Sequence, residues 1–119
     1  MRTFVLALAL AIGWSGAAAA QSVGGSYAVK GTNFDGSPYG GTAEITPSSN
    51  STCRIVWKTG SATSTGTCML ANKAFAAFYK LGSSFGLVVY EVLADGTLKG
   101  VWTIADKNGA GTETLIPTK

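Results

Sequence analysis

The sequence has no histidine and few charged side chains, and both shortages limit the chemistry that it can perform. Of its 119 residues, nine are lysine or arginine and six are aspartate or glutamate. Histidine is the commonest general base and the commonest metal ligand in proteins. With no histidine, the many serines and threonines have no evident base partner. We therefore expect no catalytic residues, no metal site and no cofactor, and a protein that is not an enzyme.

The six acidic residues are scattered and give no paired-carboxylate pattern. Aspartates occupy turn positions, where their side chains bond to the local backbone: Asp35 and Asp95 precede glycine, and Asp106 lies just before Asn108 and Gly109. The three glutamates fall on strand positions that read as outward-facing: Glu44, Glu91 and Glu113. The lysines form no basic run or stripe, so a nucleic-acid partner is not expected.

The first twenty residues are typical of a secretory signal. Met1-Arg2-Thr3 is a short positive start, residues 4–12 are apolar, and residues 17–20 are small, as at a cleavage site. The apolar run is shorter than the roughly 20 residues that a membrane-spanning helix needs. We predict a signal peptide over residues 1–20, a single exported domain over residues 21–119, no membrane span after cleavage, and a periplasmic or secreted location.

The two cysteines, Cys53 and Cys68, suit a structural disulfide. Each lies in an alternating segment, and the two segments flank a turn at Gly60-Ser61. A hairpin centred on that turn places the cysteines directly opposite each other. Antiparallel partners lie about 4.5–5.5 Å apart at Cα, a separation that a disulfide can bridge.

Short alternating segments between turn residues recur along the chain, which is the pattern of an antiparallel β-domain. The only helical candidate, residues 69–80, also suits a strand, and we favour the strand. Full closure removes exposed sheet edges, so we predict an all-β, eight-stranded up-and-down barrel, with a two-sheet sandwich as the alternative. The strands are expected at residues 25–31, 40–46, 52–58, 63–71, 74–81, 85–93, 97–104 and 111–116.

One hairpin pattern is written twice, at residues 27–45 and 90–104: Tyr-x-Val, then Asp-Gly, then a glycine, then an isoleucine. In the second copy, a three-residue loop at residues 94–96 with Gly96 left-handed places Val88 opposite Trp102 and Tyr90 opposite Gly100. We expect the Tyr90 ring to cover Gly100. The residues predicted to face the interior, where a small ligand could bind, are Tyr27, Trp57, Tyr90 and Trp102.

The longest irregular stretch, residues 31–41, carries apolar side chains on a predicted loop. Exposed loops with aromatic residues are common contact sites. The candidate binding loop comprises Phe34, Asp35, Pro38 and Tyr39.

Four segments resemble a family of small exported proteins from soil and root-associated proteobacteria that are often labelled fibronectin-binding proteins. They read GGSYAVKGTNFDGSPYGGTAEIT, CRIVWKTGS, GLVVYEVLADGTLKGVWTIA and GTETL, and they span nearly all of the exported domain. The resemblance implies a non-enzymatic exported protein that binds an extracellular or cell-envelope macromolecule. The alternatives are a periplasmic protease inhibitor, by analogy of architecture, or a carrier of a small apolar ligand. We expect a monomer whose partner is a protein or a small apolar molecule.

Overall fold

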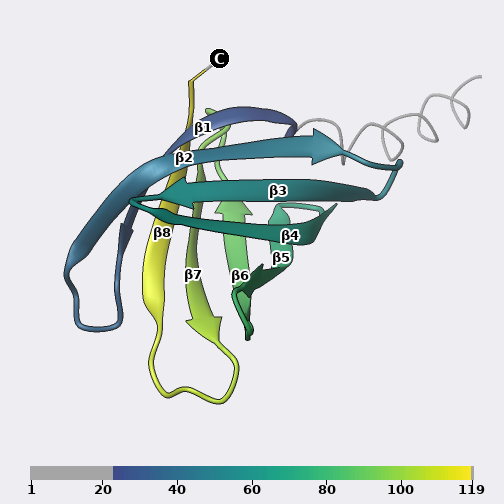
Figure 1. Ribbon diagram of the computed structural model, residues 1–119. Helices are drawn as coiled ribbons and strands as arrows, with labels where there is room; N and C mark the ends of the chain where they lie inside the picture. Colours follow the sequence, from purple (N-terminus) through teal and green to yellow (C-terminus); the bar gives the residue numbers. More distant parts are fainter. Residues whose placement is uncertain (1–22, 119) are drawn as a thin grey trace, which may run out of the picture.

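Residues 23–118, described by a computed structural model, form a closed antiparallel β-barrel (Figure 1). Eight strands follow one another around the barrel in sequence order, and β1 pairs with β8 to complete the closure. The barrel is thus of the up-and-down type, as predicted, and the sandwich alternative does not apply. The predicted signal peptide lies outside the described residues. Within them, no helix has the length and apolar character needed to cross a membrane.

The strand boundaries agree with the predicted ones to within two residues, because glycine and polar turn residues mark each boundary. The strands are β1 (Gly25–Thr32), β2 (Pro38–Pro47), β3 (Thr52–Thr59), β4 (Ala62–Ala71), β5 (Ala74–Leu81), β6 (Ser84–Val92), β7 (Leu98–Ile104) and β8 (Gly111–Pro117). Residues 69–80 form the end of β4, a turn and all but the last residue of β5. Asn72 takes a left-handed backbone in this turn (φ 56°), which asparagine tolerates better than most residues. The strand prediction for this segment is confirmed.

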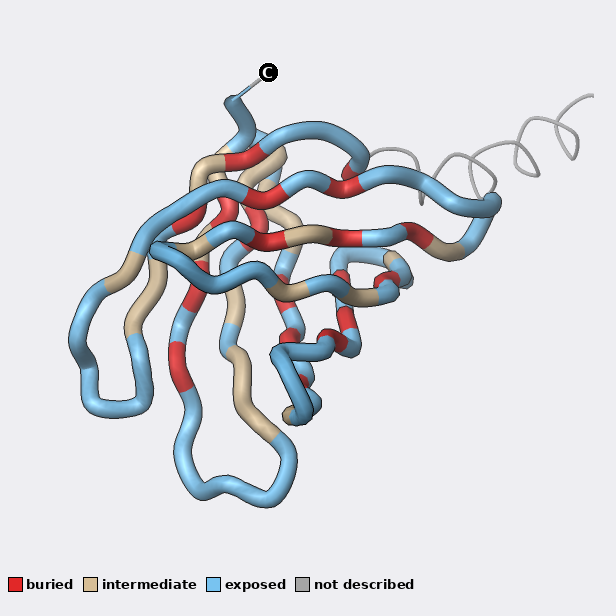
Figure 2. The backbone as a smooth tube through the Cα atoms, viewed as in Figure 1, coloured by how far each residue is buried: buried red, intermediate tan, exposed pale blue. Residues whose placement is uncertain are grey.

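Alternation along the strands separates an apolar interior from the outer surface (Figure 2). Successive side chains of a strand point to opposite faces, so every second residue enters the core. In β3, for example, Cys53, Ile55 and Trp57 are buried while Arg54 and Lys58 are exposed. The largest fully buried side chains include Tyr90, Phe75, Ile55, Leu98 and Leu115.

The predicted register of the β6–β7 hairpin is confirmed. Tyr90 pairs with Gly100 and Val88 with Trp102, and Gly96 is left-handed (φ 89°). The expectation that the Tyr90 ring covers Gly100 is wrong. A side-chain carbon at Gly100 would first meet the Val89 carbonyl oxygen and the Tyr90 Cα, which are backbone atoms, not the Tyr90 ring. Glycine is required there because the two strand backbones approach closely.

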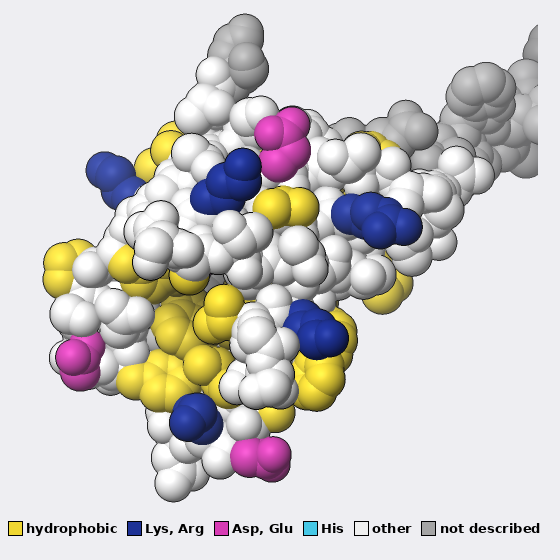
Figure 3. Space-filling model, in the orientation of Figure 1, with side chains coloured by type: hydrophobic (Ala, Val, Ile, Leu, Met, Phe, Trp, Pro, Cys, Tyr) yellow, Lys and Arg dark blue, Asp and Glu magenta, His cyan; other side chains and the backbone are white. Residues whose placement is uncertain are grey.

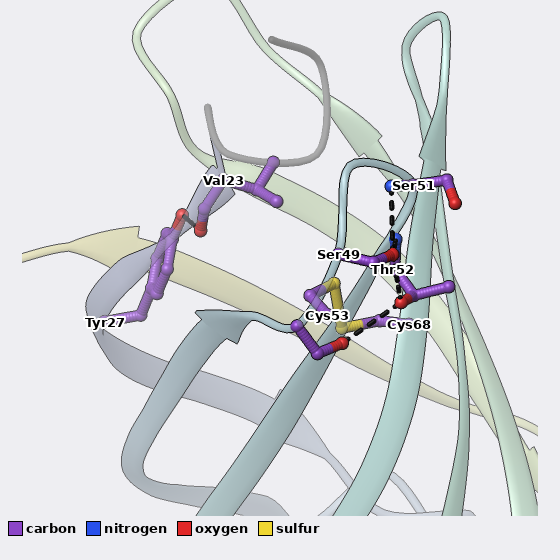
Figure 4. Close-up of a disulfide and its surroundings, with 8 residues drawn as sticks. Val23, Tyr27, Ser49, Ser51, Thr52, Cys53 and Cys68 are labelled. Atoms are coloured by element: carbon purple, nitrogen blue, oxygen red, sulfur yellow. Dashed lines mark hydrogen bonds between the residues drawn. A yellow bond between two sulfur atoms is a disulfide. The ribbon is translucent and has the colours of Figure 1, made fainter. Parts of the chain in front are cut away.

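The disulfide lies at one end of the barrel (Figure 4). Cys53 of β3 and Cys68 of β4 are register partners and are bonded, with Cα atoms 5.0 Å apart, as the sequence predicted. At the same end, Tyr27 donates a 2.6 Å hydrogen bond to the backbone oxygen of Val23. Val23, two residues before β1, is buried and packs into the core.

Candidate functional site

A cavity of about 480 Å³ opens at the end of the barrel opposite the disulfide. The connections β1–β2, β3–β4, β5–β6 and β7–β8 surround this end, and Figure 3 shows hydrophobic side chains gathered in a hollow between them. Strands β2 to β8 and two of the connecting segments contribute to the wall. The lining residues are Asn33, Tyr39, Gly40, Trp57, Thr59, Gly60, Ala62, Ser64, Tyr79, Leu81, Val88, Trp102 and Glu113.

Glu113 lies inside the barrel, which corrects the prediction that it faces outward. Only 6% of the residue is exposed, and it is the only buried charged residue among those described. Alternation along the strand could have indicated this burial, because Leu115 lies two positions after Glu113 and side chains two residues apart point to the same face. The outward prediction followed the general rule that a glutamate is almost never fully buried unless it is paired. Glu44 and Glu91 are exposed, as predicted.

Three neutral donors from three strands converge on the Glu113 carboxylate. Oε1 accepts a hydrogen bond from the Tyr39 hydroxyl (2.6 Å). Oε2 accepts one from the Trp57 indole N–H (2.7 Å) and one from the Tyr90 hydroxyl (2.5 Å). This is the arrangement of an ionised carboxylate, which only accepts hydrogen bonds. The cluster satisfies the buried oxygens, and no buried side-chain nitrogen or oxygen among the described residues lacks a partner.

Glycines on neighbouring strands hold three of the aromatic rings against the wall of the cavity. Tyr39 pairs with Gly31, Tyr79 with Gly86, and Trp102 with Gly111. At each of these glycines, an added side-chain carbon would collide with ring atoms of its partner. Each ring therefore occupies the space that a side chain would fill, a cross-strand arrangement known to support glycine in sheets. Because the rings lie along the wall, the axis of the barrel stays open at this end.

Hydrogen bonds and ring contacts fix these aromatic side chains further. The Tyr79 hydroxyl donates to the Thr103 backbone oxygen (2.8 Å), and the Trp102 indole N–H donates to the Thr112 backbone oxygen (3.2 Å). Trp57 and Tyr79 meet edge to face, with ring centroids 5.4 Å apart. The site is therefore preorganised, with ring positions set by the fold itself.

The tyrosines around Glu113 stay protonated over the whole physiological range. Burial raises the pKa of Tyr79 to about 12, and the charge of Glu113 adds to the rise. Burial, again reinforced by Glu113, raises the pKa of Tyr39 and of Tyr90 as well. A phenolate is disfavoured both by the loss of water and by a negative neighbour. The hydroxyls of Tyr39 and Tyr90 thus act as constant hydrogen-bond donors to the carboxylate.

The four predicted interior residues all lie inside or against the core, but they serve different parts of the barrel. Tyr27 is buried near the end that carries the disulfide, whereas Trp57 and Trp102 line the cavity. Tyr90 is fully buried and reaches the site through its bond to Glu113. Sequence reasoning missed Tyr79, whose alternation with Phe75 and Ala77 on β5 marks it as inward.

Two of the four predicted loop residues contact the cavity wall. Phe34 stacks on Trp102 with ring centroids 5.0 Å apart, and Tyr39 reaches Glu113. Asp35 and Pro38 are exposed. Asp35 accepts hydrogen bonds from the Ser37 backbone N–H and hydroxyl, which lower its pKa and stabilise the turn. The predicted loop over residues 31–41 is too long, because β1 ends at Thr32 and β2 begins at Pro38, so Pro38 and Tyr39 lie on a strand and Phe34 alone connects the loop, residues 33–37, to the cavity wall.

A second apolar hollow, of about 680 Å³, lies over the outer face of β4–β7. Several of its side chains are about half-exposed, and Leu87 is 59% exposed. They include Met69, Phe78, Leu87, Val89 and Val101. No charged residue lines this outer groove within the described chain. It therefore offers apolar contact without the convergent polar groups of the interior cavity.

Comparisons with known proteins connect this chain to solved structures alone. No protein-family model matches the sequence. No curated protein matches it either. The resemblance to proteins labelled fibronectin-binding therefore stays a prediction.

The similar solved structures are β-barrels. A redesigned barrel, mFAP1, bound to DFHBI, has a TM-score of 0.70 at 23% identity, over 82% of this chain and 97% of its own. A fluorescence-activating barrel designed de novo has a TM-score of 0.65 at 15% identity, over 84% and 97%. A variant of the fluorescent protein UnaG has a TM-score of 0.53 at 11% identity, over 83% and 98%. At these identities the likeness establishes the fold only.

Proposed function

We propose that this protein is an exported, non-enzymatic carrier that binds a small, largely apolar ligand in the open end of its barrel. The observation that carries the proposal is the interior cavity, where apolar walls surround a few convergent polar groups. Small-molecule sites are typically concave, about 300–1,000 Å³ in volume, and of this mixed composition. The cavity lies within that range.

Two further observations support the proposal. The redesigned barrel mFAP1, which is bound to DFHBI, shares this architecture. The Cys53–Cys68 disulfide is compatible with an oxidising compartment, as the predicted signal peptide requires. Within the site, the many rings favour a flat or aromatic ligand, because aromatic faces bind such surfaces by stacking.

The macromolecular partner implied by the resemblance has less support from the geometry. In that interpretation the β1–β2 loop would present Phe34 and Tyr39 to a protein surface. Phe34 instead stacks on Trp102, and Tyr39 hydrogen-bonds to Glu113 inside the barrel. The small-ligand alternative uses Tyr39 where it lies, in the cavity wall.

Binding of Nile red, an uncharged apolar fluorophore, tests the proposal. The exported domain should enhance its emission. Ser64 lines the cavity on β4, where it is the register partner of Trp57 on β3. Ser64→Phe should therefore fill the cavity and abolish the enhancement without removing any aromatic ring. Leu87→Lys, in the outer groove, is the matched control and should bind the dye normally. Enhancement that survives Ser64→Phe and disappears in Leu87→Lys would move the site to the outer groove, and the absence of binding would refute the carrier.

A further inference from the structure

The interior cavity contains a negative charge, on Glu113, that no described residue of its wall neutralises. The donors to Glu113 are two phenols and an indole, all uncharged. Among the described residues, no lysine or arginine lines the cavity. Hydrogen bonds lower the cost of burying a carboxylate, but they leave its charge in place. The potential at the floor of the cavity is therefore negative, although the whole chain has a formal net charge of +3.

Oε1 of Glu113 can accept a further hydrogen bond. Oε2 accepts from both Trp57 and Tyr90, whereas Oε1 accepts only from Tyr39. Each carboxylate oxygen has about two acceptor positions. A ligand N–H group or cation at the cavity floor could thus approach Oε1 without displacing a donor.

The aromatic rings add a second feature that favours positive charge. Tyr39 and Tyr79 each lie over a glycine on one side, which leaves the opposite ring face toward the cavity, whereas the Trp102 ring lies between Gly111 and the stacked Phe34 ring. Trp57 completes the set from β3. The face of an aromatic ring is electron-rich and attracts cations within about 6 Å of its centre, and several such faces together recognise ammonium groups.

We propose that the ligand is an organic cation whose ammonium group lies between the rings of Tyr39, Trp57 and Tyr79 and the Glu113 carboxylate. The inference rests on the proposed carrier function and specifies its ligand class: an aromatic or alkyl body with a single positive charge. The rings contribute cation–π attraction, and the carboxylate contributes charge pairing inside the barrel. The same charge repels anionic ligands, which gives the site its selectivity.

A pair of probes of equal shape isolates the contribution of the charge. Phenyltrimethylammonium and tert-butylbenzene have nearly the same shape and differ in whether the central atom is a cationic nitrogen or a carbon. Titration calorimetry on the exported domain should show that the cation binds about thirtyfold more tightly, as expected for a desolvated cation–π site worth about 2 kcal/mol. Benzenesulfonate, the anion, should not bind.

Two variants assign the preference to the proposed groups. Glu113→Gln keeps the shape and removes the charge, so the preference for the cation should fall severalfold. Glu44→Gln removes an exposed carboxylate on β2 and should leave it unchanged. If Glu113→Gln fails to fold, Tyr79→Leu serves instead, since it removes a ring but keeps the carboxylate, and it should also reduce the preference.

The outcomes separate this inference from the function on which it rests. If tert-butylbenzene binds as tightly as phenyltrimethylammonium, the cation inference is wrong while the carrier stands. If neither probe binds and Nile red does not bind, both proposals fall. If the preference for the cation is equal in wild type and in Glu113→Gln, the carboxylate does not contribute to cation binding, and the inference is overturned.

Discussion

The indole N–H of Trp57 donates a 2.7 Å hydrogen bond to Oε2 of Glu113 and so joins β3 to β8 across the barrel interior. Among the described residues, Trp57 is the only side chain of β3 that donates a hydrogen bond to this carboxylate. The bond thus serves the fold and the site together, because it positions a cavity ring and satisfies a buried charge.

Trp57→Phe should therefore destabilise the protein. A hydrogen bond to a charged group contributes about 1.5–3 kcal/mol, and its loss leaves the buried oxygen with fewer donors. Urea unfolding measures the change. Trp102→Phe is the matched control, since Trp102 is partly exposed and donates to a neutral backbone oxygen. Trp57→Phe should cost clearly more, and equal losses in the two variants would contradict the role assigned to the Trp57–Glu113 bond.

Gly86→Ala should push the Tyr79 ring into the cavity. An added carbon at Gly86 collides with ring atoms of Tyr79, and overpacking typically costs about 1–3 kcal/mol. The variant should melt at a lower temperature and bind Nile red less tightly. Combining it with Tyr79→Leu removes the clash, so the two stability losses should be less than additive. Additive losses would show that the ring does not lie over the glycine.

Gly100→Val tests the close approach of β6 and β7. A side chain there would meet the Val89 carbonyl oxygen, and backbone cannot move away as a flexible side chain can. The variant should lose about 1–3 kcal/mol of stability or more, despite the higher strand preference of valine. Lys99→Val, at the adjacent outward position, should be close to neutral. A melting temperature of Gly100→Val at or above wild type would contradict the close contact.

The extent to which the sequence predicts this structure differs between the wall and the interior. Strand positions and registers follow from alternation and turn residues, so pairs such as Cys53–Cys68 and Tyr90–Gly100 could be placed before any coordinates. Glu113 could not, because its burial depends on three donors from β2, β3 and β6 that converge only after closure. Local patterns record which face a residue shares with its neighbours, but not which distant groups will satisfy it.

The disulfide should contribute a large share of stability. Cys53 and Cys68 are 15 residues apart in sequence, and closing such a loop reduces the entropy of the unfolded chain by an amount worth about 3 kcal/mol. Replacing both cysteines by alanine should lower the unfolding free energy by about that amount in urea denaturation. Intact mass with and without reductant should differ by two hydrogens. Two alkylatable thiols in the unreduced protein would contradict the bond.

Alkaline titration should show that the tyrosines ionise late and that ionisation unfolds the barrel. The pKa of Tyr79 is about 12 in the folded protein and about 10 in an unfolded chain. Because the folded value is the higher one, the contribution of Tyr79 to stability is complete below about pH 10 and is lost as the pH rises toward about 12. Burial and the charge of Glu113 raise the pKa of Tyr39 and Tyr90 in the same direction.

Tyrosinate absorbance and far-ultraviolet circular dichroism, followed together as the pH rises, measure both events. Absorbance should stay low near pH 10 and increase together with the loss of strand signal. Glu113→Gln should shift the titration to lower pH, because it removes the negative charge next to Tyr39, Tyr79 and Tyr90. The pKa of Tyr27 is raised by burial alone, so its titration should not respond to that substitution. Ionisation of several tyrosines near pH 10 with the strand signal intact would show that the ring cluster around Glu113 is open to water.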